Sequence, residues 1–351
     1  MALTASSRSM PPMPRVDLTD HYHRTCHLPS QSPWFGAGPP IIVPFPRHHA
    51  LYRPLLKAAS NSVSAAGSWL DGNVNEEIAL NSCPMAHGLF SGWLNFTLVR
   101  EPVERFVSSY NFLMGDTHYE REICGLVQKL LPTIAPSLSC PRRSQRSIHN
   151  VSEFSAYLSV VEQLGWLNAH IVPQAMQLTQ LDGRPDPTLR VQRLMGSSSD
   201  AVKEQVRGIL TRNQSDIVGI GRSSGSNAGT ATANRVHATP KGDHSIGDYR
   251  ALPSNLLIRA CRLVLVDYCC FGIPLHPVCQ RAGLSCHATS NGLLELPMGR
   301  FGLEAARPSW RRMIWRNPNV PKCLDDAKRT TPLCSSVCLG RSVTVAKGNM
   351  T

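Results

Sequence analysis

The stretch LVREPVERFVSSYNFL, residues 98–113, decides the fold class that this sequence predicts. A short apolar run with β-propensity precedes Arg100. Pro102 suits the first turn of a helix, where its missing N–H costs nothing. The residues that follow keep an apolar face at helical spacing, namely Val103, Phe106, Val107, Tyr110 and Leu113. We therefore expect a strand, a turn at Arg100 and a helix that contains Ser108.

This arrangement places Arg100 at the carboxyl end of a strand and Ser108 in the helix after it. In open α/β sheets, ligands bind at the carboxyl ends of strands. An arginine fork together with a hydroxyl suits a phosphate. An ordinary strand–turn–helix with an exposed arginine fits this stretch equally well, so the stretch alone leaves both interpretations open.

A second stretch, LYRPLLKAASNSVSAA at residues 51–66, follows a similar order. An apolar run ends at Lys57, small residues follow, and a helix is expected to begin near Ser62. The N-terminus of a helix binds anions, and Lys57 adds a positive charge. The Walker A pattern of glycines before Lys-Ser/Thr is absent, which argues against a nucleotide kinase. Taken alone, KAASNS is also explained by a plain capped helix.

Together, the two stretches resemble motifs of the Golgi carbohydrate sulfotransferases, in particular the branch of the heparan and dermatan uronyl 2-O-sulfotransferases. The first loop of that family, Pro-Lys with small and hydroxyl residues, is similar to residues 56–62, although Leu56 replaces the proline. The second motif, Arg-Asp/Glu-Pro-x-Glu-Arg and then a serine, is similar to residues 100–105 with Ser108. The resemblance covers roughly residues 46–280. It implies an α/β, P-loop-like sulfotransferase fold with a central, mainly parallel sheet flanked by helices.

The resemblance also implies an activity, the transfer of a sulfuryl group from 3′-phosphoadenosine 5′-phosphosulfate (PAPS) to a hydroxyl of a glycan or glycosaminoglycan. The 5′-phosphosulfate would be bound by the first loop, which comprises Lys57, Ala58, Ala59, Ser60, Asn61 and Ser62. The 3′-phosphate would be bound by Arg100 and Ser108. By analogy with phosphoryl transfer, Lys57 would also stabilise the charge on the transferred group and on the leaving oxygen. No metal is implied.

A general base and acceptor contacts are expected from two histidine segments. His87, in PMAHGLF, lies in the interval where the family has its proposed base, and it also fits a structural histidine at a strand end. The segment WLNAHIVPQAMQL, residues 166–178, resembles a family segment near the acceptor, with His170 and Gln174 as contacts. A helix-terminating Pro-Gln turn explains it as well. The altered loop and the single histidine leave an alternative function open: a catalytically inactive relative that binds PAP, the desulfated donor, or an anionic glycan.

Charge and cysteine content bound the class of protein. Lysine and arginine total 36 against 24 acidic residues, giving a formal charge of +12, which attracts polyanions. RNA-binding aromatic motifs and zinc-finger spacings are absent, but composition alone leaves nucleic acid, an anionic membrane and an acidic glycan open. The resemblance implies an anionic glycan as partner and no nucleic acid. The 12 cysteines include no CxxC pair, which favours disulfides in an oxidising lumen over a zinc site.

We expect a flexible stem over residues 1–45, a sulfotransferase domain over 46–280 and a C-terminal extension of unknown role over 281–351. The run LVLVDYCCFG, residues 263–272, is expected to pack in the core. The resemblance implies the lumenal side of the Golgi membrane, and N-x-S/T sequons predict glycosylation, with Asn150 as the better candidate. The sequence has no apolar run long enough for an anchor, so membrane association rests on resemblance alone and a cytoplasmic location is the alternative.

Overall fold

The computed structural model describes the part of the chain whose residue ranges follow. These are residues 16–28, 41–71, 78–79, 90, 92–115, 117–138, 150–166, 168, 170–180, 183–196, 198–217 and 248–286. His87 and most of the C-terminal extension from 281 lie outside the described residues.

Among the described residues, five strands form one sheet in the order β3-β1-β2-β4-β5. The strands are β1 (Ile41–Phe45), β2 (Ala50–Tyr52), β3 (Ile78–Ala79), β4 (Leu94–Val99) and β5 (Leu189–Arg193). β4 pairs in parallel with β2 on one side, where Tyr52 faces Phe96, and with β5 on the other. β1 pairs antiparallel with both β2 and β3. The α/β class is confirmed, but the sheet is parallel only across β2, β4 and β5.

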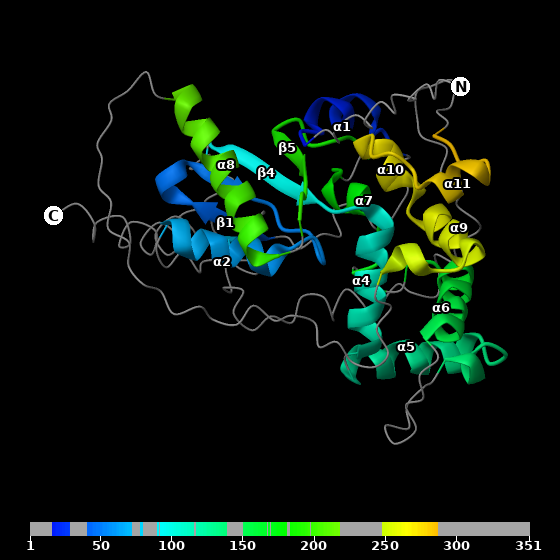
Figure 1. The fold of residues 1–351 in the computed structure, drawn as a ribbon. Coiled ribbons are helices and arrows are strands. Elements are labelled where there is room, and N and C mark those ends of the chain that lie inside the picture. Colours follow the sequence, from blue (N-terminus) through cyan, green and yellow to red (C-terminus); the bar gives the residue numbers. More distant parts are fainter. Residues whose placement is uncertain are drawn as a thin grey trace, which may run out of the picture.

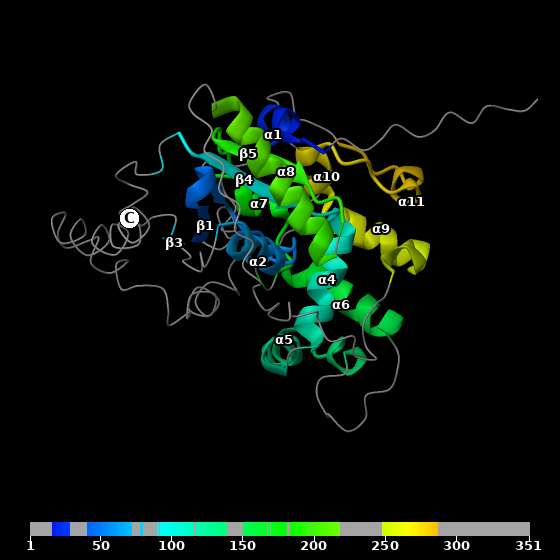
Figure 2. The same cartoon turned by 60° about the vertical axis from the view of Figure 1, so that its left-hand side comes forward.

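Helices flank the sheet and extend away from it beyond the end of β4 (Figures 1 and 2). The α-helices are α1 (Thr19–Thr25), α2 (Ser60–Asp71), α4 (Pro102–Gly115), α5 (Thr117–Leu130), α6 (Asn150–Leu164), α7 (Gln174–Leu178), α8 (Ser199–Ile217), α9 (Ser254–Leu263), α10 (Leu265–Phe271) and α11 (Pro277–Arg281). Short 3₁₀ helices are η1 (Pro46–His48), η2 (Ala135–Ser137) and η3 (Tyr249–Ala251). The expected turn at Arg100 between a strand and a helix is therefore present.

Side chains along β4 point alternately to the two faces of the sheet, and each face packs against its own apolar core. Leu94, Phe96 and Leu98 point to the face where α2 and α8 pack side by side (Figure 1). Val99 points to the other face and belongs to a second, larger core, which contains residues of α1, α4, α6, α7, α9 and α10. Successive side chains of a strand point to opposite faces, so a strand with apolar residues at both parities is buried on both sides. β4 is thus the central strand that fixes the position of Arg100.

The expected flexible stem is wrong for the described part of residues 1–45. α1 packs on α10 and β5, and Leu18 N donates to Val191 O over 2.9 Å. A disulfide joins Cys26 to Cys270, and β1 is a strand of the sheet. A seven-residue helix carries too short an apolar pattern to be recognised in a Pro- and Ser-rich segment, and its anchor is a cysteine 244 residues away.

The predicted disulfides are present. Besides Cys26–Cys270, the described cysteines form Cys261–Cys279 and Cys269–Cys286, and Cys124 is disulfide-bonded too. The adjacent cysteines 269 and 270 therefore tie α10 to two different segments. Within the described residues, no helix is long and apolar enough to cross a membrane.

Candidate functional site

The two motifs found separately in the sequence follow adjacent parallel strands. The first loop comes after β2 and leads into α2, whereas Arg100 comes after β4 and leads into α4. Beyond the last paired residues, Arg53 N donates to Phe96 O over 2.8 Å and Thr97 Oγ1 donates to Arg53 O over 2.8 Å. Because the carboxyl ends of parallel neighbours share one edge of the sheet, both motifs lie at that edge.

The first loop has an unusual backbone. Lys57 and Ala59 both have positive φ, at 62° and 61°, and Ala58 between them does not. Left-handed conformations cost non-glycine residues roughly 1–2 kcal/mol each, and alternation of handedness is typical of turns whose N–H groups bind anions. Ala58 N already donates to Leu55 O over 3.1 Å. The donors that suit an anion here are therefore those from Ala59 into the first turn of α2.

Arg100 connects the second motif to this loop. Its Nη1 lies 3.5 Å from Lys57 O, and its Nη2 forms an ion pair with Glu104 Oε1 at 2.7 Å. The side chain is 20% exposed, and its Nε is buried without a hydrogen-bond partner among the described residues. A buried, unsatisfied donor on an arginine costs free energy that an anionic ligand could recover.

Ser108 lies on the stripe of α4 that faces the same loop. Glu104, Ser108 and Phe112 recur at intervals of four, so they line one side of the helix, and all three are half-exposed. At the N-terminal end of this stripe, Glu104 forms the ion pair with Arg100. At its C-terminal end, Phe112 contacts Lys57 of the first loop, whose Nζ lies 3.3 Å from the centroid of the phenyl ring. Ser108 therefore lies on the same side of α4, one turn from Glu104 and one turn from Phe112, and its role in phosphate binding stays a prediction.

His170 meets Lys57 at Phe112. The imidazole packs against the phenyl ring with 4.8 Å between centroids. Its loop is held to α4 by the buried Ser109, whose Oγ donates to His170 O over 2.6 Å. Burial, and to a lesser extent the positive charges of Lys57 and Arg105, together lower the pKa of His170 to about 3. The imidazole is therefore neutral across the physiological range.

Gln174 has a different position from the one expected of an acceptor contact. It is fully buried at the start of α7, and its amide holds the backbone of Arg100 on both sides. Arg100 N donates to Gln174 Oε1 over 2.9 Å, and Gln174 Nε2 donates to Arg100 O over 2.9 Å. A contact of Gln174 with substrate stays a prediction, and the described hydrogen bonds make it a residue that positions Arg100.

α10 supports this turn from behind with two neighbouring residues. Asp267 is fully buried and accepts from Gln174 N over 2.9 Å and Ala175 N over 2.8 Å. Burial raises the pKa of Asp267, while Arg105 and these hydrogen bonds act in the opposite direction. Tyr268 donates its hydroxyl to Glu101, the residue after Arg100. The segment expected only to pack in the core thus also fixes the second motif.

Arg105 supplies a buried positive charge behind the first loop. It is fully buried, and its Nε donates to Leu56 O over 2.9 Å. Its Nη1 and Nη2 have no hydrogen-bond partner among the described residues. Burial lowers its pKa to about 10, so the guanidinium remains charged at neutral pH. With Lys57 and Arg100, it makes the site electropositive.

Of the predicted site residues, the structure brings together Lys57, Arg100, Ser108 and His170, and gives Gln174 a supporting position. Ser60 is half-buried, Asn61 exposed and Ser62 buried at the start of α2. His87 lies outside the described residues, so its role as base stays a prediction. Sequence reasoning missed Phe112 and Asp267. The signal for Asp267 was a single carboxylate within an apolar run, since buried carboxylates are paired.

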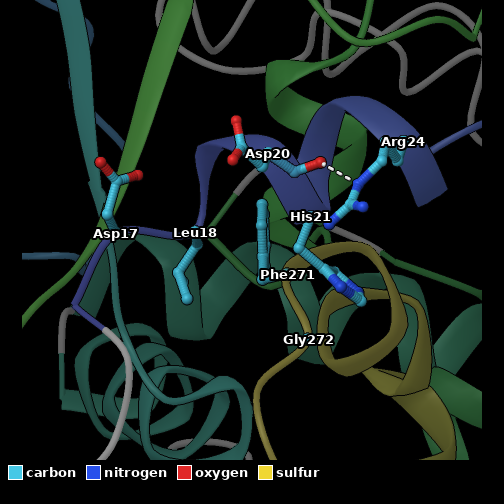
Figure 3. A pocket seen from close by; sticks show the side chains of 7 residues that line it. All are labelled: Asp17, Leu18, Asp20, His21, Arg24, Phe271 and Gly272. Atoms are coloured by element: carbon cyan, nitrogen blue, oxygen red, sulfur yellow. Dashed lines mark hydrogen bonds between the residues drawn. The ribbon is translucent and has the colours of Figure 1, made fainter.

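A pocket of about 260 Å³ lies elsewhere, between α1 and the end of α10 (Figure 3). Asp20 and Arg24 stand at its surface, with Arg24 Nε donating to Asp20 O over 3.1 Å, and Phe271 forms part of its apolar lining. A Cβ at Gly272 would approach the His21 ring within 2.8 Å, so this glycine permits close packing of α10 on α1. None of its lining residues belongs to the predicted site.

Two further results bear on the site. Within the described residues, no three His, Cys, Asp or Glu side chains gather in a way that could hold a metal ion. No protein-family model, curated protein or solved structure matches the chain. Functional conclusions therefore rest on the two motifs and on their geometry.

Proposed function

We propose that the protein is a PAPS-dependent sulfotransferase of P-loop-like fold that moves a sulfuryl group to a hydroxyl of a carbohydrate. The observation that carries this proposal is the direct contact between two separately recognised motifs. Arg105 Nε donates to Leu56 O over 2.9 Å, and Arg100 Nη1 lies 3.5 Å from Lys57 O. A donor with phosphates at both its 3′ and 5′ positions needs two anion sites that are close together.

The proposed roles are those that the resemblance implies, and the contacts described above are compatible with them. The loop from Lys57 to Ser62 binds the 5′-phosphosulfate through backbone N–H groups and the Lys57 ammonium. Arg100 and Ser108 bind the 3′-phosphate. Lys57, with the buried charge of Arg105 behind the loop, stabilises the charge that develops on the leaving oxygen. No step requires a metal in this scheme.

The acceptor and the location are proposed from charge and cysteines. A formal charge of +12 favours an anionic glycan over a neutral one. Disulfides that join segments 244 residues apart favour an oxidising lumen such as that of the Golgi.

Transfer of radiolabelled sulfate from PAPS across a panel of glycans tests the activity. Wild-type protein should label at least one anionic glycan. Lys57→Ala should abolish labelling, whereas Lys129→Ala, an exposed lysine on α5, should leave it unchanged. PAP binding without transfer to any glycan would favour the catalytically inactive alternative.

A further inference from the structure

His170 lies beside the loop that is proposed to bind the phosphosulfate. Its ring and the Lys57 ammonium contact the same phenyl ring, that of Phe112, at 4.8 Å and 3.3 Å from its centroid. His170 and Lys57 are both mostly buried but keep a minor exposed fraction, and a substrate would reach the two side chains there. His170 thus lies next to Lys57 of the first loop, although it is more than 100 positions later in the sequence.

Asn168 determines which ring nitrogen of His170 carries the proton. The backbone N–H of His170 donates to Asn168 Oδ1 over 2.9 Å, which identifies this atom as the amide oxygen. The same oxygen lies 2.6 Å from His170 Nδ1. An amide oxygen only accepts, so Nδ1 carries the proton and Nε2 carries the lone pair. This pattern, an imidazole oriented by a second side chain, is that of a general base.

We propose that His170 is the general base of the proposed reaction, with Asn168 as the residue that positions it. In this step, Nε2 takes the proton of the acceptor hydroxyl as the hydroxyl oxygen forms its bond to sulfur. The bond from sulfur to the 5′-phosphate oxygen breaks, and PAP leaves with that electron pair. The sulfated acceptor, PAP and a protonated His170 balance the reaction.

The proposal rests on the proposed function and makes its own statement about pH. Among the described residues, the charges that act on the imidazole are those of Lys57 from the first loop and Arg105 from α4, and both lower its pKa. A bound phosphosulfate would offset the charge of Lys57 and raise this pKa, but burial, the main cause of the shift, remains. The imidazole is therefore neutral throughout the physiological range, and the charge of a bound phosphosulfate would make it more basic. If the base were instead a histidine of ordinary pKa, the transfer rate would fall below about pH 6.5.

Chemical rescue tests the assignment. His170→Ala should bind PAP within a few-fold of wild type by calorimetry, yet transfer sulfate roughly 10²–10⁴-fold more slowly. Added imidazole should restore part of the rate, because it can enter the space left by the side chain. The matched variant His21→Ala removes a histidine of α1 outside the site, and its rate should stay at the wild-type level.

Two outcomes would overturn the assignment. The first is a folded His170→Ala protein with the full wild-type rate. The second is a wild-type rate that rises through pH 6.5, the ordinary pKa of a histidine. Either outcome would move the base to another residue while leaving the donor site intact. Failure of wild-type protein to bind PAP at all would instead reject the proposed function on which the assignment depends.

Discussion

Replacing Gln174 with alanine should weaken PAP binding without removing any group that is proposed to touch PAP. The amide makes two hydrogen bonds of 2.9 Å to the backbone of Arg100. Each buried partner left unsatisfied costs about 1–3 kcal/mol, so the free energy of unfolding should fall by roughly 2–6 kcal/mol. Direct loss of the arginine–phosphate contact would cost roughly 1.5–3 kcal/mol. Misplacing Arg100 loses part of this, which corresponds to about tenfold in affinity.

Gln177 provides the matched control for this variant. It is the same residue on the same helix, is equally buried, and donates through Nε2 to Val172 O over 2.7 Å rather than to Arg100. Gln177→Ala should lower the free energy of unfolding by about 1–3 kcal/mol and leave PAP affinity unchanged. Urea unfolding and calorimetry measure the two quantities separately. Equal PAP affinities for the two variants would refute the positioning role of Gln174.

Three further predictions follow from the same contacts. Ser108→Ala should weaken PAP binding, whereas Ser109→Ala should mainly slow transfer, because Ser109 holds the His170 loop and not the donor. Similar PAP affinities and transfer rates for the two variants would contradict this division. Since the folded-state pKa of His170 is lowered to about 3 from 6.5, the unfolded state binds a proton first as pH falls, so stability should be full above about pH 6.5 and decline toward pH 3. In His170→Gln, the free energy of unfolding measured with urea should depend less on pH between about 6.5 and 3. An unchanged pH dependence would argue against a mostly buried, neutral imidazole. Mass spectrometry of alkylated, non-reduced protein from its native source should find cysteines 261, 269, 270 and 279 protected, and free thiols there would contradict the lumenal assignment.

Local patterns predicted the part of the fold that carries the site. The β-propensity before Arg100 and the helical spacing after Pro102 correspond to β4 and α4, and the run before Lys57 leads from β2 into α2. Strand pairing is a long-range property, so the antiparallel addition of β1 and β3 was not visible in either stretch. α1 was not predicted, because a disulfide and tertiary packing, rather than its own sequence, hold it in place.

The candidate site could be predicted only for residues that sit within a recognisable local pattern. Lys57, Arg100 and Ser108 each belong to such a pattern. Phe112 and Asp267 depend on which helix faces which loop, and this is decided by packing between distant segments. Gln174 was singled out because its segment resembles a family segment. The partners of its side chain could not be predicted, because they are backbone atoms of the distant Arg100.

The measurement that tests the central claim most directly is a calorimetric comparison of PAP with adenosine 5′-phosphate, using wild-type protein and Arg100→Ala. Arg100 is proposed to bind the 3′-phosphate, the group that distinguishes these two nucleotides. Wild type should prefer PAP by roughly ten- to a hundred-fold, as expected for a charge-assisted hydrogen bond to phosphate. Arg100→Ala should lose this preference and keep its affinity for adenosine 5′-phosphate. Equal affinity of the wild-type protein for both nucleotides would contradict the account.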